Sequence, residues 1–172
     1  MGEGALPASQ KRAIVLPSLK LIGLDVNDMA NNRPISNLSF LSKTVEKYVS
    51  IQLISHLEAN SLLPKQQTGF RKFHSTESVL TRILVDLYTA VDQGHVTLLA
   101  LFDVSAAFDT VDHGILLERL EKPFGVVGRS LLWLRDFLSG RSQSVVFGST
   151  RSEWSRVSFG LPQGSILGPL YR

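Results

Sequence analysis

The stretch Leu98-Leu99-Ala100-Leu101-Phe102-Asp103-Val104-Ser105-Ala106-Ala107-Phe108-Asp109 passes from a continuous apolar run to a carboxylate. The run begins near Val96 and is rich in residues suited to a strand covered on both faces. We therefore expect a buried strand at 96–102, with Asp103 at its carboxyl end. A strand that ends on a carboxylate beside a backbone turn is one way to position a metal ligand.

Asp103 is the best candidate for a Mg²⁺ ligand. Mg²⁺ prefers one or two carboxylate oxygens and takes its other ligands from water and substrate phosphates, and the carbonyl of Val104 offers a further oxygen. Spacing alone leaves a simpler alternative open, in which Asp103 only caps a turn after a buried strand. Hydrolase chemistry ranks last, because no Ser or Cys nucleophile motif accompanies the Asp112-His113 pair.

Composition narrows the class of protein without deciding it. The chain has 172 residues, 44% of them hydrophobic, which suits one ordinary domain with a hydrophobic core. It has no cysteine, which excludes disulfides and thiolate zinc sites. The balance of 18 basic and 15 acidic residues permits a polyanionic partner without demonstrating one. No targeting signal or membrane-length apolar run is recognised, so we expect an intracellular protein of the cytoplasm or nucleus that has no membrane partner.

Hydrophobic periodicity predicts an α+β fold in one compact unit. Helices are expected from Ser39 to Asn60, from Ser75 or Thr76 to Gly94, from Asp112 to Leu120, and from Ser130 to Leu138. Strands are expected at 13–16, ending at Pro17, and as a hairpin at 143–147 and 156–159, while 24–33 reads as an irregular loop. In the first helix the apolar face is formed by residues at intervals of three and four: Leu41, Val45, Tyr48, Val49, Leu53 and Leu57.

The segment from Phe102 to His113 closely resembles motif A of reverse transcriptases from non-LTR (LINE-type, jockey-like) retrotransposons. The resemblance implies that Asp103 binds both catalytic metal ions. It also implies that Phe108 lies under the sugar and excludes a 2′-hydroxyl. Without the resemblance, Phe108 is most simply a core aromatic. Asp109, Asp112 and His113 also match, but capping or hydrogen bonding at the start of the next helix explains them, and no catalytic role is assigned to them.

The segment from Gly160 to Pro169 resembles motif B of the same enzymes, whose turn and following helix contact the incoming nucleotide and the template base. The residue types suit that task. Gly164 lets the backbone approach a ligand without a Cβ in the way, and Gln163 offers an amide donor and acceptor. Taken alone, this segment is an ordinary Pro-Gly turn; downstream of a matching motif A, it supports a nucleotide site.

Upstream residues resemble the fingers motifs of this family. Arg33, in Arg33-Pro34-Ile35-Ser36, matches the arginine that grips the triphosphate, a task suited to its planar donor fork. Lys20 falls where a phosphate-binding lysine is usual. Either residue is otherwise a solvated surface charge. The segment 67–76 matches the following region, in which Arg71 and Lys72 would face template or duplex phosphates.

The resemblance covers about Ser9 to Leu170 and implies the fingers and partial palm of a right-hand polymerase. The fingers region spans about 1–95 and the partial palm about 96–172, together an incomplete reverse transcriptase domain. The resemblance implies that the complete enzyme is an RNA-directed DNA polymerase that uses two Mg²⁺ ions, an RNA template, a DNA primer and deoxynucleoside triphosphates. Mild departures are Asn32, where an aromatic is usual, and Phe102-Asp103-Val104 in place of Leu-Asp-Leu.

The 172 residues contain no Asp-Asp pair, so motif C of the family is not among them. Nucleotidyl transfer assisted by two metal ions needs further carboxylates beside Asp103. We therefore expect the isolated chain to be inactive as a polymerase. The alternatives are a non-catalytic fragment that binds nucleic acid, and a retrotransposon relic without function.

Overall fold

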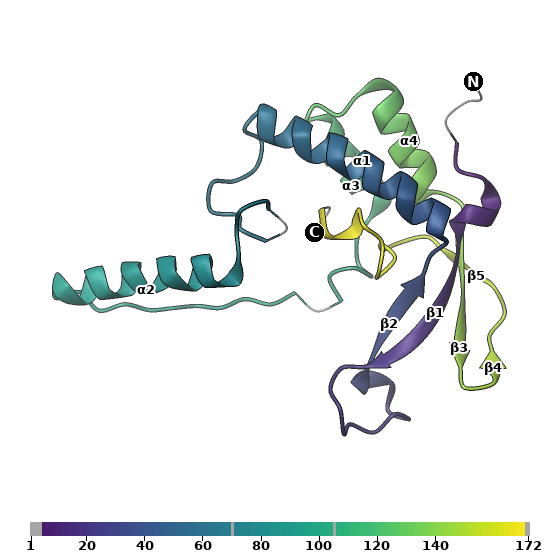
Figure 1. The fold of residues 1–172 in the computed structure, drawn as a ribbon, viewed down its shortest axis with the longest axis horizontal. Helices are drawn as coiled ribbons and strands as arrows, with labels where there is room; N and C mark the ends of the chain where they lie inside the picture. The colour runs from purple at the N-terminus through teal and green to yellow at the C-terminus, as the bar shows by residue number, and fades with distance from the viewer. Residues whose placement is uncertain (1–4, 70, 105, 171–172) are drawn as a thin grey trace.

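A mixed β-sheet and a cluster of helices form the body of the protein, and a separate helical arm projects from it (Figure 1). The computed structural model describes residues 5–69, 71–104 and 106–170. The predicted α+β class is confirmed, because the described residues form both α-helices and strands, with the α-helices between the second and third strands in the sequence. The prediction of a single compact unit is wrong, because the arm has few contacts with the body.

The sheet is centred on β1 (Arg12–Leu19). β2 (Asn32–Asn37) pairs with one side of β1 in antiparallel register, and β3 (Arg141–Phe147) pairs with the other side in parallel. The short strands β4 (Thr150–Arg151) and β5 (Ser155–Val157) both pair antiparallel with β3. The predicted hairpin is thus confirmed, although its second strand ends before Phe159.

Two local predictions about this sheet are wrong. β1 continues through Pro17 to Leu19, because β3 pairs only with residues 12–15 and leaves no ladder on that side for the proline to interrupt. The expected loop at 24–33 contains a short 3-10 helix, η2 (Met29–Asn31), and the last two residues of the expected loop, Asn32 and Arg33, belong to β2.

The helices of the body are α1 (Phe40–Ala59), α3 (His113–Glu121) and α4 (Gly128–Leu138). The predicted cap of α3 is confirmed, because the Asp112 side chain accepts a hydrogen bond from the Ile115 amide. Ser39 caps α1 in the same way, by accepting a hydrogen bond from the Ser42 amide. Short 3-10 helices lie at Ala8–Lys11 and Gly168–Leu170. In the part of the chain that the structure describes, no helix combines the length and apolarity needed to cross a membrane.

These helices and the segment after β5 share one hydrophobic core. Trp133 and Phe137 of α4 stack in it, with ring centroids 5.4 Å apart. The buried members of the core are Leu6, Leu53, Leu57, Leu120, Val126, Leu131, Leu134, Phe137, Leu138, Leu161 and Leu167.

The buried face of α1 differs from the predicted one over its first half. Leu41 and Tyr48 are exposed, whereas the polar residues Ser42, Glu46 and Ser50 are buried. Only the second half, with Leu53 and Leu57, buries the expected apolar stripe. Buried polar side chains need hydrogen-bonding partners. The elements packed against α1 therefore determine which of its faces is buried.

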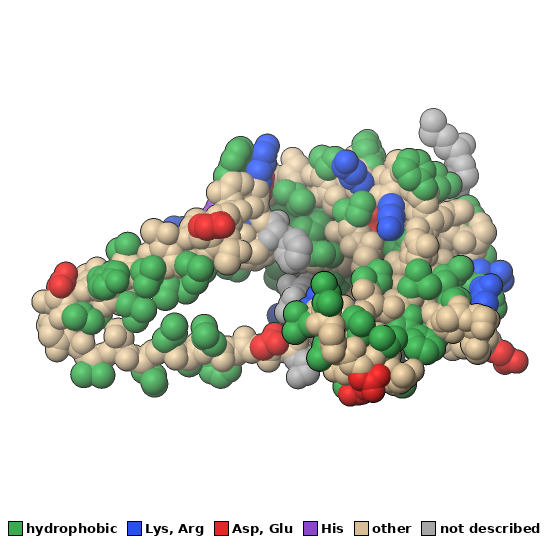
Figure 2. Space-filling model, turned by 60° about the horizontal axis from the view of Figure 1, so that its bottom comes forward, with side chains coloured by type: hydrophobic (Ala, Val, Ile, Leu, Met, Phe, Trp, Pro, Cys, Tyr) green, Lys and Arg blue, Asp and Glu red, His purple; other side chains and the backbone are tan. Residues whose placement is uncertain are grey.

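The arm consists of α2 (Thr76–Asp92) and an extended segment at 95–104 that runs back beside it (Figure 1). Ser75 caps α2 as predicted, in a reciprocal pair of hydrogen bonds with Ser78. The predicted strand at 96–102 is wrong. Val96 is 100% and Phe102 94% exposed, and no described residue pairs with this segment. A strand needs a hydrogen-bonded neighbour, which this segment lacks. The apolar side chains of the segment lie on the open surface in Figure 2.

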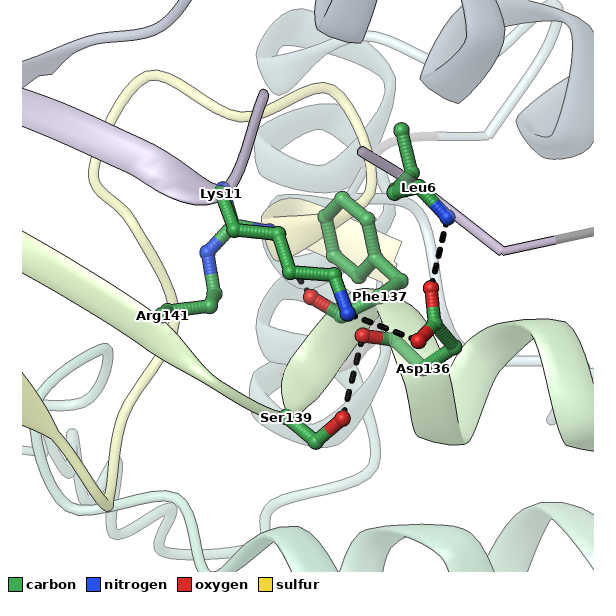
Figure 3. A network of polar contacts seen from close by, with 6 residues as sticks. All are labelled: Leu6, Lys11, Asp136, Phe137, Ser139 and Arg141. Atoms are coloured by element: carbon green, nitrogen blue, oxygen red, sulfur yellow. Dashed lines mark hydrogen bonds and ion pairs between the residues drawn. The ribbon is translucent and has the colours of Figure 1, made fainter. Parts of the chain in front are cut away.

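The amino-terminal segment is fastened to α4 by Asp136, as Figure 3 shows. One carboxylate oxygen accepts from the Leu6 amide and the other from Lys11 Nζ, both at 2.7 Å. Burial acts to raise the pKa of Asp136, but the hydrogen bonds from Lys11 and Leu6 and the charge on Lys11 outweigh it, so the pKa lies below its ordinary value.

Replacing Asp136 with Asn removes the charge that attracts Lys11. At pH 7 we expect the variant to lose about 1 kcal/mol of unfolding free energy, measured by urea denaturation. Because the folded-state pKa is lowered, this contribution is present above the unfolded value of about 4 and disappears as the pH falls through the folded-state pKa. The difference between wild type and variant should therefore shrink in acid.

The control is Asp86→Asn, which removes an exposed carboxylate on α2. We expect this control variant to have an unfolding free energy close to that of wild type, both at pH 7 and in acid. An Asp136→Asn variant as stable as wild type at pH 7 would contradict the assignment.

Candidate functional site

Residues 160–168 join the sheet, α1 and the turn that precedes α3. The Leu161 amide donates to the Phe108 carbonyl at 2.6 Å, and the Gly160 amide donates to the Val111 carbonyl at 2.8 Å. The His113 ring nitrogen Nε2 lies 2.7 Å from the Gly160 carbonyl oxygen. The segments that resemble motifs A and B are therefore in direct contact through their backbones.

The Gln163-Gly164 turn lies against β2. The Ser36 amide donates to the Gln163 carbonyl at 2.7 Å. Gly164 has a φ of +110°, and a Cβ at this position would lie 2.9 Å from the Ser36 carbonyl oxygen. Both the backbone conformation and the close approach require glycine here. The close approach seen here is to the protein's own strand β2, and the expected approach of Gly164 to a ligand stays a prediction.

Phe108 is half-buried and packs against the hydrophobic core. A Cβ added to Gly168 would lie 3.3 Å from its ring, which shows how closely residue 168 approaches it. The simple interpretation of Phe108 as a core aromatic therefore describes its packing. Its role under a sugar stays a prediction.

The two basic residues predicted to bind phosphate lie at opposite ends of the β1–β2 connection. Arg33 is exposed on β2, at the position paired with Ser18. Lys20 is also exposed, and its Nζ donates to the Ala30 carbonyl at 2.6 Å. Lys20 therefore stabilises this connection, while Arg33 lies on the strand that contacts the Gln163-Gly164 turn.

Asp103 and Val104 are exposed on the extended segment of the arm, so Asp103 does not follow a strand. Its carboxylate oxygen Oδ1 accepts a hydrogen bond from the Val104 amide at 2.9 Å. Across the described ranges, no group of three or more His, Asp or Glu residues could hold a metal ion. One carboxylate and one carbonyl are too few donors for a pair of Mg²⁺ ions, so these residues alone do not fit that centre.

Arg71 and Lys72 lie in the loop between α1 and α2 and differ in their surroundings. Arg71 Nη1 donates to the Pro64 and Gln67 carbonyls at 3.1 and 3.3 Å, which stabilises the loop itself. Lys72 is exposed, with its Nζ 5.0 Å from the Phe73 ring centroid. Phe70, which belongs to the same predicted segment, lies outside the described residues, as does Ser105 of the motif A segment.

A cavity of about 390 Å³ lies beside the Gln163 turn, between the sheet and residues 158–163. Ser36, Asp109, Gln143 and Arg141 contribute to its lining. Arg141 is only 2% exposed; its Nη1 donates to the Phe137 carbonyl at 2.7 Å, and its Nη2 has no hydrogen-bonding partner among the described residues. Burial lowers the pKa of Arg141, and the charge on Glu46 partly opposes that shift.

Sequence reasoning missed Arg141 and Glu46, the two charged side chains buried beside this site. Glu46 lies on the predicted helix but between its apolar positions, where a solvated face is expected. Arg141 directly follows Gly140 and begins a strand, and a lone charge there has no signal that distinguishes it from a surface residue.

Comparison with known proteins decides the family. Residues 24–171 match the family described as reverse transcriptase (RNA-dependent DNA polymerase). This chain belongs to the reverse transcriptase family. The motif resemblance found in the sequence is thereby confirmed at the level of the family.

Among its relatives, this reverse transcriptase family member is similar to polymerases of mobile elements. It is 34% identical over 148 residues to a probable RNA-directed DNA polymerase from transposon X-element of Drosophila melanogaster, over 86% of this chain and 16% of that protein. It is 30% identical over 166 residues to the RNA-directed DNA polymerase from mobile element jockey of the same species, over 96% of this chain and 18% of that protein. The chain thus spans less than a fifth of the length of these relatives.

Replacing Gly164 with Ala should strain the turn and push it away from Ser36. We expect a loss of about 2 to 3 kcal/mol in unfolding free energy, because the new Cβ meets the backbone and φ is positive. The control is Gly148→Ala, whose φ is +59° and whose Cβ would meet nothing within 4 Å. That variant should lose only about 1 kcal/mol. Equal losses in urea denaturation would show that the contact with Ser36 is unimportant.

Proposed function

We propose that this chain is the nucleotide-contacting part of an RNA-directed DNA polymerase, made of the fingers region at about 1–95 and a partial palm at about 96–172. The observation that supports this most directly is the hydrogen bond from the Ser36 amide to the Gln163 carbonyl. It fastens the motif B turn to the strand that carries Arg33. Residues predicted to contact the base and the triphosphate thus belong to one connected unit.

In this proposal each matched residue keeps the role that the family implies. Arg33 and Lys20 meet the triphosphate, because a guanidinium fork and an ammonium group suit phosphate oxygens. Gln163 and Gly164 contact the nucleotide and the template base, and Phe108 excludes a 2′-hydroxyl. From membership of the family we expect the substrates to be an RNA template, a DNA primer and a deoxynucleoside triphosphate.

The metal centre of the proposed enzyme needs more than this chain provides. Mg²⁺ ions, when bound, would activate the primer hydroxyl and stabilise the leaving pyrophosphate. Asp103, with the Val104 carbonyl, is the contribution of these 172 residues to that centre. Asp103 and Val104 alone do not supply the further carboxylates that two Mg²⁺ ions need.

We therefore expect the purified 172-residue chain to lack polymerase activity. The measurement is primer extension on an RNA template with Mg²⁺ and all four deoxynucleoside triphosphates. We expect no incorporation above a no-enzyme control, because one carboxylate cannot hold both ions. Robust, Mg²⁺-dependent incorporation that disappears in an Asp103→Ala variant would overturn this expectation.

Template binding is testable in the isolated chain. Lys72 is exposed, so replacing it with Ala should weaken binding to a single-stranded RNA. The slope of the logarithm of the binding constant against the logarithm of the salt concentration should also become shallower, by about 0.7 for the one lost phosphate contact. The matched control is Lys47→Ala, which replaces another exposed lysine, on α1. Fluorescence anisotropy at several salt concentrations measures both. Equal effects of the two variants would contradict a specific role for Lys72, and no binding by wild type would favour a relic.

A further inference from the structure

Glu46 is fully buried in the first half of α1, with an exposed fraction of 0%. Its Oε1 accepts from Ser42 Oγ at 3.1 Å, and its Oε2 accepts from the Ile166 amide at 2.8 Å. Ser42 lies on the same helix, whereas Ile166 lies in the segment that follows the Gln163-Gly164 turn. The carboxylate therefore connects α1 to that segment.

The cost of burying a carboxylate makes this placement informative. A buried charge is expensive unless it is hydrogen-bonded and compensated. Apolar side chains are available on α1, yet Leu41 and Tyr48 are exposed while Glu46 is inside. An apolar residue at position 46 could fill the space, but it could not accept a hydrogen bond from Ile166.

The segment 163–166 is held at two points. The Ser36 amide of β2 binds the Gln163 carbonyl, and Glu46 of α1 binds the Ile166 amide. Between them, the Ser165 amide donates to the Pro162 carbonyl at 3.0 Å. β2 ends at Asn37 and α1 begins at Phe40, so the two points of attachment lie on adjoining elements.

We propose that Glu46 is a positioning residue for the nucleotide site, because its hydrogen bond to the Ile166 amide holds the Gln163-Gly164 turn against the strand that carries Arg33. This inference rests on the proposed function for its functional consequence. The fixed position of the turn itself is a property of the chain and can be measured separately.

The test compares Glu46→Ala with Glu46→Gln in the full 172-residue chain. Gln keeps an oxygen for the Ile166 amide and offers an amide group to Ser42, so it should restore what Ala removes. For Glu46→Ala we expect amide hydrogen exchange at Ile166 and its neighbours to accelerate on the order of tenfold, while amides of α4 change by less than about twofold. Glu46→Gln should remain close to wild type.

A second measurement on the same samples connects the turn to the nucleotide. Titration with dATP and Mg²⁺, followed by NMR, should show affinity on the order of tenfold weaker in Glu46→Ala and nearly unchanged in Glu46→Gln. If wild type does not bind dATP, the proposed nucleotide contact fails, and the exchange measurement still decides whether Glu46 holds the turn.

Two controls separate positioning from general stability. Ser50→Ala removes another buried hydroxyl of α1, which donates to the Lys47 carbonyl of its own helix, and should leave exchange at 166–168 unchanged. If Glu46→Ala does not fold, the milder Ser42→Ala should raise exchange in the same segment by a smaller factor. The proposal would be overturned if Glu46→Ala left the protection of the Ile166 amide unchanged, or if it lowered the protection of the α4 amides equally. It would also be overturned if Glu46→Gln did not restore protection at Ile166.

Discussion

The rest of the structure depends on one constraint, the fixed path of residues 160–168. Backbone hydrogen bonds join this segment to Phe108 and Val111 before α3, and to Ser36 on β2. A side chain on α1 holds it at Ile166. Because these partners come from widely separated parts of the sequence, the segment determines how the sheet, α1 and the turn before α3 meet. Gly160 and Gly164 permit this, since a Cβ at either position would lie within 3.0 Å of a backbone carbonyl oxygen.

The same region contains the main electrostatic cost of the fold. Glu46 and Arg141 are both almost completely buried. The ion pairs between described residues do not include one between these two side chains. Arg141 is instead held by the Phe137 carbonyl and lies over the Phe137 ring, with Cζ 4.7 Å from its centroid. Such buried charges add little to stability compared with apolar packing, but they fix geometry because any displacement breaks their few hydrogen bonds.

The sequence predicted those features that depend on nearby residues. Ser75 and Asp112 cap helices as expected, because capping involves only residues within one turn. The strand at 96–102 failed for the opposite reason: its composition suits a covered strand, but a strand forms only with a paired neighbour. The buried position of Glu46 was missed because periodicity places charged residues outside.

The site could be predicted in part. Motif order brought Gln163, Gly164 and Phe108 into one hypothesis, and the structure places all three along or against the 160–168 segment. The interactions of Arg71 and Lys20 with loop carbonyls were not predictable, because they depend on the path of the backbone rather than on residue type.

The parallel pairing of β1 with β3 has a consequence for how the chain acquires its structure. Ala13 pairs with Gln143, and Val15 with Val145, so about three quarters of the chain separates the partners. β1 and β2 can pair early, but the other edge of β1 remains open until β3 has been synthesised. Long-range pairing of this kind slows folding, since the entropy of closing the intervening chain is lost before the contacts form. During synthesis, the sheet therefore stays incomplete until residues 141–157 have been made.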